Sequence, residues 1–198
     1  MRILNRRKLL LVGSYIATGL PLWGQQIHNP ERQTGPVMEV AVLYNPLLSN
    51  VVAANRFWMQ GGSIQVNAHL WHGWGVMADV SGLHAQNANS SGVGLDLVTS
   101  TFGPRYRWSP PSSRFAFFSQ ALAGRANGFN SLFPGAIAAT SSASSLALQI
   151  GGGIDLPMKH RLSLRAFEAD WLRTQLPNST TNVQNNLRLA VGLAVRFP

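Results

Sequence analysis

Cysteine is absent from the 198 residues, which excludes disulfides, thiolate nucleophiles and cysteine-ligated metals. Charge is also scarce, since only 12% of residues are charged, with 16 Lys+Arg against 7 Asp+Glu. Four of the basic residues lie in the first eight positions, so the remainder carries 12 basic and 7 acidic residues, a net charge of +5. These remaining cations are scattered singly among apolar residues. We therefore expect no nucleic-acid interface, because such an interface needs a basic patch.

Long hydrophobic runs are missing everywhere except at the start of the chain. Met1 to Lys8 is basic, Leu9 to Trp23 is apolar, and a polar segment begins at Gly24. The apolar run, interrupted by a glycine and a proline, is shorter than the ~20 residues that a spanning helix needs. We therefore expect a secretory signal peptide at residues 1–24, followed by a polar lead-in at residues 25–35.

The rest of the chain, residues 36–198, is dominated by alternating apolar and small or polar residues, which favours β-sheet over helix. Most of the alternating segments are close to the 9–11 residues of a tilted transmembrane strand. Without a spanning helix, a closed barrel is the remaining way to cross a membrane. The sequence predicts an all-β, eight-stranded antiparallel up-and-down transmembrane β-barrel in the bacterial outer membrane. Its strands are expected at Val37–Asn45, Gly61–Leu70, Gly75–His84, Val93–Trp108, Arg114–Gly124, Ser144–Asp155, Arg161–Arg173 and Gln184–Phe197.

Short and long connectors alternate along these segments, as they do in outer-membrane barrels, where short turns are periplasmic and long loops extracellular. Both termini are then periplasmic. The third long connector is rich in small residues and is expected to be the most mobile part. The short connectors are His72–Trp74, Ser109–Ser113 and Pro157–His160, and the long ones are Pro46–Gln60, Ala85–Gly92, Arg125–Ala143 and Thr174–Val183.

The last segment indicates which face points outward. An apolar row from Leu187 to Phe197 alternates with a row of small and charged residues from Arg188 to Arg196. The second row suits a narrow lumen, so the apolar row is expected to face lipid. In the seventh segment, a β-bulge near Ala166–Phe167 is needed to turn its arginines and acids to one side. A similar slip is expected between Asp96 and Arg105.

Six of the seven acids lie in or at the ends of predicted strands with apolar neighbours. Because an isolated ion in a lumen is costly, we expect these acids, Asp155 included, to pair with inward arginines in a structural network. Asp170 with Arg188 is the preferred pair, because the last hairpin brings them nearly opposite. The expected network is Glu39, Asp79, Asp96, Arg105, Arg107, Arg165, Glu168, Asp170 and Arg188.

Aromatic residues gather near the ends of the predicted strands. Two aromatic belts at the two membrane interfaces are therefore expected, although ordinary core aromatics could give the same pattern. One belt would hold Trp71, Trp74, Trp108, Phe115 and Phe197 near the short turns, and the other would hold Tyr44, Phe57, Trp58 and Trp171 near the long loops.

Three stretches carry a family resemblance: GPRYRW (Gly103–Trp108), the segment from Gly151 to Thr174, and NNLRLAVGLAVRF (Asn185–Phe197). Over roughly Pro36 to Phe197 the chain resembles the small OmpA-like and OmpX-like outer-membrane β-barrels. The resemblance implies outer-membrane lipid as surroundings and the barrel-assembly machinery as a partner during biogenesis. The terminal aromatic that looks like part of the assembly signal is followed here by Pro198.

Catalytic chemistry is poorly represented. His160 and Ser163 do not show the spacing of a lipid deacylase, and the five histidines are spread over different elements. We expect no enzyme activity, cofactor or metal. The first hypothesis is a non-enzymatic outer-membrane protein with a structural or surface-interaction role through its long loops. The alternatives are a narrow conduit or binder for a small or apolar ligand, a lipid-modifying enzyme, and a secreted soluble barrel with an apolar interior.

Overall fold

The computed structural model describes residues 37–51, 56–88, 92–135 and 137–198. The expected signal peptide and lead-in lie outside these residues. Among the described residues, no helix is long and apolar enough to cross a membrane. The described chain contains the strands β1 (Val37–Tyr44), β2 (Leu47–Ser49), β3 (Phe57–Trp71), β4 (Trp74–Ala85), β5 (Leu95–Trp108), β6 (Ala116–Phe129), β7 (Ala143–Pro157), β8 (Leu162–Thr174) and β9 (Gln184–Phe197).

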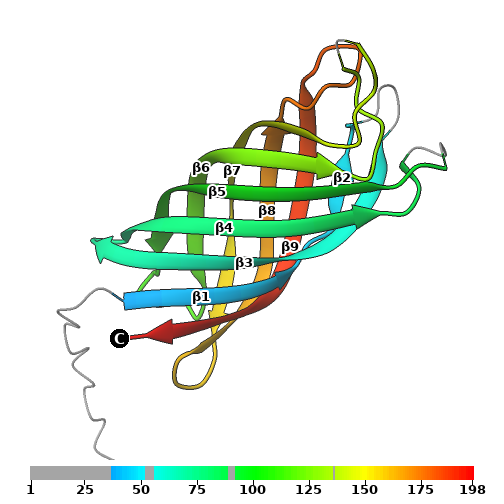
Figure 1. Cartoon of the computed structure of the whole chain (residues 1–198). Coiled ribbons are helices and arrows are strands. Elements are labelled where there is room, and N and C mark those ends of the chain that lie inside the picture. Colours follow the sequence, from blue (N-terminus) through cyan, green and yellow to red (C-terminus); the bar gives the residue numbers. More distant parts are fainter. Residues whose placement is uncertain (1–36, 52–55, 89–91, 136) are drawn as a thin grey trace, which may run out of the picture. The chain divides into compact units, whose positions relative to one another are not determined.

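The strands form one closed antiparallel barrel (Figure 1). Each of β3 to β8 pairs with the next strand in sequence, and β9 returns to pair with β1 and β2. Since β1 and β2 occupy one position between β3 and β9, the barrel is eight-stranded, as the sequence predicts. Closure removes the open edges that a flat sheet would expose.

The first barrel strand is interrupted at Pro46, which has no N–H to donate. Its register is unchanged across the break: Tyr44 lies opposite Gly62, and Leu47 lies opposite Met59. The Pro46 carbonyl still accepts a hydrogen bond from Leu189 N at 2.9 Å. The prediction of a long loop starting at Pro46 is therefore wrong, because the strand continues as β2 to Ser49 before the chain leaves the barrel.

The β3–β4 turn is a two-residue turn of His72 and Gly73. Both residues have positive φ, 43° and 89°, which is the arrangement of a type I′ turn and matches the twist of the flanking strands. At Gly73 a Cβ atom would come within 2.6 Å of the Arg107 carbonyl oxygen. Glycine is therefore required here by both the backbone conformation and the close approach of β5.

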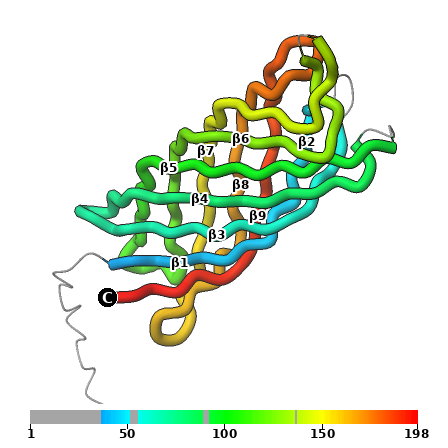
Figure 2. Tube along the Cα trace, in the orientation of Figure 1, coloured from blue at the N-terminus to red at the C-terminus, as the bar shows by residue number. Residues whose placement is uncertain are grey.

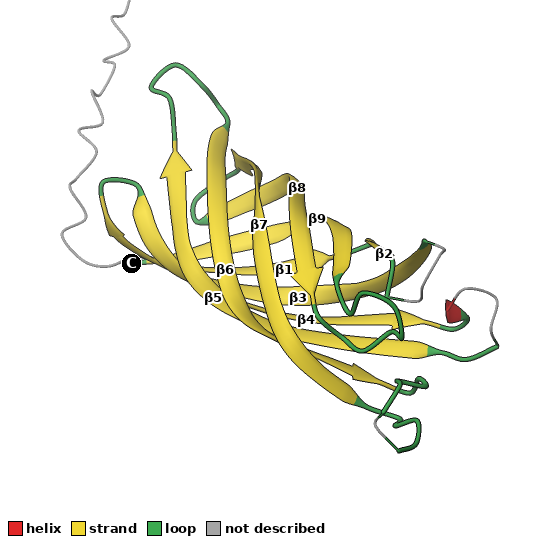
Figure 3. Cartoon of the chain, turned by 90° about the horizontal axis from the view of Figure 1, so that it is seen from above, coloured by secondary structure: helices red, strands yellow, loops and turns green. Residues whose placement is uncertain are grey.

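The short turns and the long connections lie at opposite ends of the barrel (Figures 1 and 2). The C-terminus and the start of β1 lie at the short-turn end. In Figure 3 the loops join long, tilted strands at both ends. The third long connection is shorter than expected, because β6 continues to Phe129. Phe133 holds it to the barrel by packing in an apolar cluster with strand residues, and a β-bridge between Phe133 and Thr140 closes the connection on itself.

The bulge predicted in the seventh segment is confirmed, but the expectation that it also turns Arg161 inward is wrong, because Arg161 precedes β8 and is exposed in the β7–β8 turn. The pairing of β8 with β9 shifts between Arg165 and Glu168, so that Ala166 and Phe167 form the irregular step. Arg165, Glu168 and Asp170 are consequently all buried on the inner face. No such shift exists in β5, where pairing with β4 is regular from Leu95 to Tyr106.

Candidate functional site

The polar residues of the lumen are the main candidate site. Alternation along each strand turns them inward, and five arginines there face five acids, so their formal charges balance. Eight of the nine residues predicted for the network lie in this cluster, and Asp155 and Arg196 complete it. The cluster, called here the lumen network, is Glu39, Asp79, Arg105, Arg107, Asp155, Arg165, Glu168, Asp170, Arg188 and Arg196.

Arg188 on β9 is the centre of the half of the network nearer the long loops. It is completely buried. Its two terminal nitrogens each lie 3.0 Å from an oxygen of Asp79. Its Nη2 also lies 2.8 Å from Asp170 Oδ2 and 3.1 Å from Glu168 Oε1. Asp170 and Arg188 are directly opposite in the β8–β9 register. The bidentate contact of Arg188 with both oxygens of Asp79 is the strong form of an arginine–carboxylate pair.

Arg165 on β8 is the centre of the other half. Its guanidinium lies 2.9 Å from Asp155 Oδ1, 3.0 Å from Glu39 Oε1 and 3.2 Å from Glu168 Oε2. Arg165 also stands 4.5 Å from the centre of the Phe118 ring. An aromatic face supplies additional attraction for a buried cation, and this inward aromatic residue was not part of the predicted network.

Three glutamines, which carry no charge, also hydrogen-bond to the acids of the lumen network. Gln65 Nε2 donates to Asp79 at 2.8 Å and to Glu168 at 2.7 Å, and its carbonyl accepts from Arg165. Gln120 and Gln149 donate to the two oxygens of Asp170. Sequence alternation places these side chains on the inward face, but it cannot show which acid each one contacts.

Asp96 was assigned wrongly to the lumen. Because β5 has no slip, Leu95 and Leu97 face inward with no exposed surface, and Asp96 faces outward. The Asp96 carboxylate lies 2.5 Å from His84 Nδ1 and accepts a hydrogen bond from Asn130. It therefore belongs to a polar cluster on the outer surface near the long loops, where water is accessible and a charge has no need of a lumen partner.

The lumen also contains an apolar layer at its long-loop end, which the sequence reasoning missed. Side chains from β2 to β8 meet there with residues of the long connections. The interior is thus divided into a charged layer and an apolar layer, rather than being small and charged throughout. The apolar layer consists of Leu47, Val51, Met59, Leu83, Ala85, Ala88, Leu95, Leu97, Ala126, Phe133, Ala147, Leu172 and Leu176.

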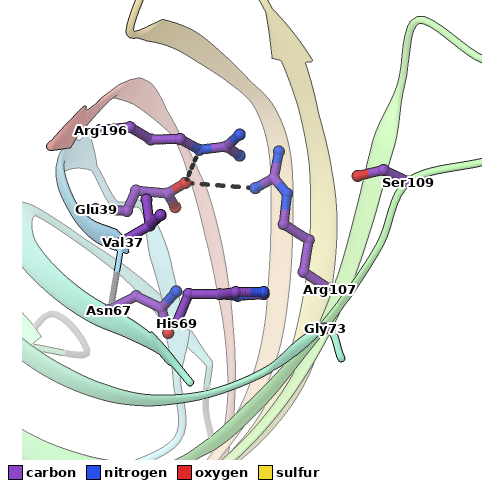
Figure 4. A pocket seen from close by; sticks show the side chains of 8 residues that line it. All are labelled: Val37, Glu39, Asn67, His69, Gly73, Arg107, Ser109 and Arg196. Carbon is purple, nitrogen blue, oxygen red and sulfur yellow. Dashed lines mark hydrogen bonds and ion pairs between the residues drawn. The ribbon is translucent and has the colours of Figure 1, made fainter. Parts of the chain in front are cut away.

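At the short-turn end the lumen opens into a polar pocket of about 300 Å³ (Figure 4). The pocket, called here the short-turn mouth, is lined by Glu39, Arg107 and Arg196 of the lumen network. Arg196 Nε lies 3.0 Å and Arg107 Nη1 3.4 Å from the same Glu39 oxygen. The remaining walls are Val37, Asn67, His69, Gly73 and Ser109.

The weak catalytic and metal candidates are not assembled into sites. His160 is exposed in the β7–β8 turn, whereas Ser163 is buried and points into the barrel. Among the described residues there is no group of three or more His, Asp or Glu side chains that could hold a metal ion. His69 lines the short-turn mouth, and His72 packs edge-on against Trp71 with ring centres 4.5 Å apart.

Between the two ends of the barrel the outer surface of the strands is largely apolar. Outward residues of β9, such as Leu187 and Val191, are exposed, whereas the intervening Arg188 and Ala190 are buried. Eight of the nine aromatic residues predicted for the belts are exposed on this surface. Phe57 is the exception, because it packs against the apolar layer inside the barrel. The exposed eight are Tyr44, Trp58, Trp71, Trp74, Trp108, Phe115, Trp171 and Phe197.

Comparison with known proteins supports the fold through structure alone. No protein-family model and no curated protein sequence matches the chain. The crystal structure of Neisserial surface protein A matches with a TM-score of 0.63 at 13% identity, over 81% of this chain and 97% of that one. Ail, the attachment invasion locus protein of Yersinia pestis, in complex with the heparin analogue sucrose octasulfate, matches with a TM-score of 0.55 at 14% identity, over 82% and 99% of the two chains.

The chain therefore has the fold of the small eight-stranded outer-membrane β-barrels, the OmpA-like and OmpX-like architecture. Its exposed apolar surface and buried charges are what a barrel in lipid requires. An interior of paired charges also excludes the secreted barrel with an apolar binding cavity. The localisation that fits this fold is the bacterial outer membrane.

Proposed function

We propose that this protein is a non-enzymatic outer-membrane scaffold that acts at the cell surface through its long loops. The observation that carries the proposal is the closed lumen. Arg165 and Arg188 have no exposed surface at the centre of the barrel, and the apolar layer lies between them and the long-loop end. An eight-stranded barrel filled by side chains leaves no open pore, so the loops are the part available for contact.

The loop sequences indicate what kind of contact to expect. In the connections 50–56, 86–94, 130–142 and 175–183, Arg56 is the only charged residue. The β6–β7 connection also exposes Leu132 and Ile137, at 69% and 101% of their surface. Hydrogen-bonding amides and hydroxyls with an apolar tip favour an uncharged partner. Ail was solved with a sulfated ligand, whereas the long connections of this chain carry Arg56 as their one cation, too little charge to favour a similar polyanion.

The test is adhesion by cells expressing the protein. The double variant Leu132→Ser with Ile137→Ser should reduce binding to host-cell or matrix surfaces. Binding by the unchanged protein should vary little between about 50 and 500 mM salt, because the proposed contact does not depend on charge. The matched control is Met158→Ser, which removes an exposed apolar side chain from the β7–β8 turn at the short-turn end. Equal adhesion by cells with and without the protein would refute the surface role.

Two further measurements separate the alternatives. Planar-bilayer recordings should show no channel conductance, and a steady conductance would favour the conduit. Mass analysis of lipid A from expressing cells should be unchanged, with His160→Ala as the control for a lipid-modifying enzyme. Outer-membrane lipid is a proposed partner of the folded barrel, and the barrel-assembly machinery is a proposed partner during biogenesis.

A further inference from the structure

The charges of the lumen network balance in total but not in space. Toward the short-turn end, two carboxylates, Glu39 and Asp155, are shared by four arginines. These four are Arg105, Arg107, Arg165 and Arg196.

The opposite half of the network has the reverse imbalance. Arg188 there faces both Asp79 and Asp170. Glu168 lies between the two halves and pairs with Arg165 on one side and Arg188 on the other. Even if Glu168 is counted with the first half, four arginines oppose three acids there. The short-turn end therefore carries an excess of positive charge, which is costly in a buried position unless an anion compensates it.

Buried donors that make no hydrogen bond lie at the same end. The Nη2 atoms of Arg105, Arg107 and Arg196 are buried and make no hydrogen bond to any described residue. The Arg107 side chain is only 10% exposed. Buried polar groups without a partner are rare and point to a missing ligand or solvent contact. Arg105 Nη2 still lies within 3.8 Å of Glu39 and Asp155, but the Nη2 atoms of Arg107 and Arg196 belong to side chains that line the short-turn mouth, and these two are a second sign of an anion site.

The geometry of the short-turn mouth makes these donors available. Figure 4 shows Arg107 and Arg196 approaching each other across the pocket, with the Glu39 carboxylate beside them. Glu39 accepts from Nη1 of Arg107 and Nε of Arg196, which leaves Nη2 of both groups unpartnered. Asn67, His69 and Ser109 add polar groups on the surrounding wall.

We propose that the short-turn mouth binds the phosphate group of a small molecule or of a lipid headgroup through Arg107 and Arg196. Guanidinium groups present paired N–H donors that match phosphate oxygens. A pocket of about 300 Å³ is at the small end of ligand-binding cavities, which suits a phosphate with a few attached atoms. The site is separate from the long loops, so it does not depend on the surface role proposed above.

The first experiment is calorimetric titration of inorganic phosphate into the protein in nonionic detergent at low ionic strength. Arg196→Gln is the main variant, because Arg196 is 34% exposed and makes one ion pair, and Arg107→Gln is the second. Each should weaken phosphate binding at least tenfold, the effect of losing a charge-assisted hydrogen bond. Arg161→Gln is the control, since it removes an exposed arginine from the same end without touching the pocket.

A gel comparison of boiled and unboiled samples first establishes that every variant is folded. Absence of phosphate binding to the unchanged protein, or equal weakening in Arg196→Gln and Arg161→Gln, would overturn the proposal. Repeating the titration in phosphatidylcholine nanodiscs, with and without phosphatidylglycerol, identifies the source of the phosphate. Competition from phosphatidylglycerol supports a lipid headgroup, and its absence supports a free phosphate compound.

Discussion

Replacing Arg188 with leucine is the sharpest test of the lumen network. Arg188 is fully buried and pairs with three acids at 2.8 to 3.1 Å. Leucine fills part of the volume but leaves Asp79 and Asp170 facing each other without a cation. Breaking a buried ion pair by removing one member costs about 3–5 kcal/mol, because the remaining charge stays desolvated.

The assay is urea unfolding in detergent micelles, followed by tryptophan fluorescence and by the gel shift of the folded barrel. With a denaturant slope of about 2 kcal/mol per molar, the unfolding midpoint should fall by about 1.5–2.5 M. Arg161→Leu is the matched control, since Arg161 is exposed in the β7–β8 turn and its loss should change stability by no more than about 0.5 kcal/mol.

Neutralising the two acids that lose their arginine should restore part of the lost stability. The triple variant with Asp79→Asn and Asp170→Asn added to Arg188→Leu should unfold at a higher urea concentration than the single variant, because two uncompensated charges are gone. An Arg188→Leu midpoint equal to that of the unchanged protein would show that the arginine is not needed to compensate these acids, and the argument from buried charge would fail.

Four other substitutions probe separate parts of the barrel. Leu97→Ala, in the apolar layer, should lower stability by about 2–5 kcal/mol in the same urea assay, whereas Asp96→Asn next to it should change stability by less than about 1 kcal/mol, because this carboxylate is on the outer surface. Val80→Arg, at the middle of β4 on the lipid face, should cost about 2–4 kcal/mol when folding is measured in lipid vesicles. Gly73→Ala should cost about 1–3 kcal/mol and lower the temperature at which the folded gel band disappears, because the turn needs positive φ.

Strand identity and facing could be predicted because lipid and lumen impose opposite polarity on alternate residues. The same rule located the bulge in β8, since only an irregular step turns Arg165 and Asp170 to the same side. For Asp96 the rule was applied too strictly. It assumed that every acid in a strand must face inward, whereas the outer surface near the long loops is polar and holds Asp96 beside His84.

Depth along the barrel axis was the missing information. Alternation fixes inside or outside, but it does not show that Leu47, Leu97 and Leu172 from distant segments reach the same level and form one layer. The register between strands also decides which acid meets which arginine. Only the hairpin pair of Asp170 and Arg188 could be worked out from the chain, whereas contacts across the lumen, such as Arg188 to Asp79, depend on the diameter and tilt of the closed barrel.

The layered lumen has a consequence for how the barrel enters the membrane. Approaching from the periplasm, each hairpin must pass its long-loop end through the hydrocarbon first. That leading end is apolar on its inner face, its outer face carries the paired Asp96 and His84, and its four long connections together contain one charged residue, Arg56. The charges of the lumen network lie behind the apolar layer, where partners on other strands pair them in the closed barrel. We therefore expect insertion to be easiest in the direction that leaves the charged short-turn mouth on the side of entry.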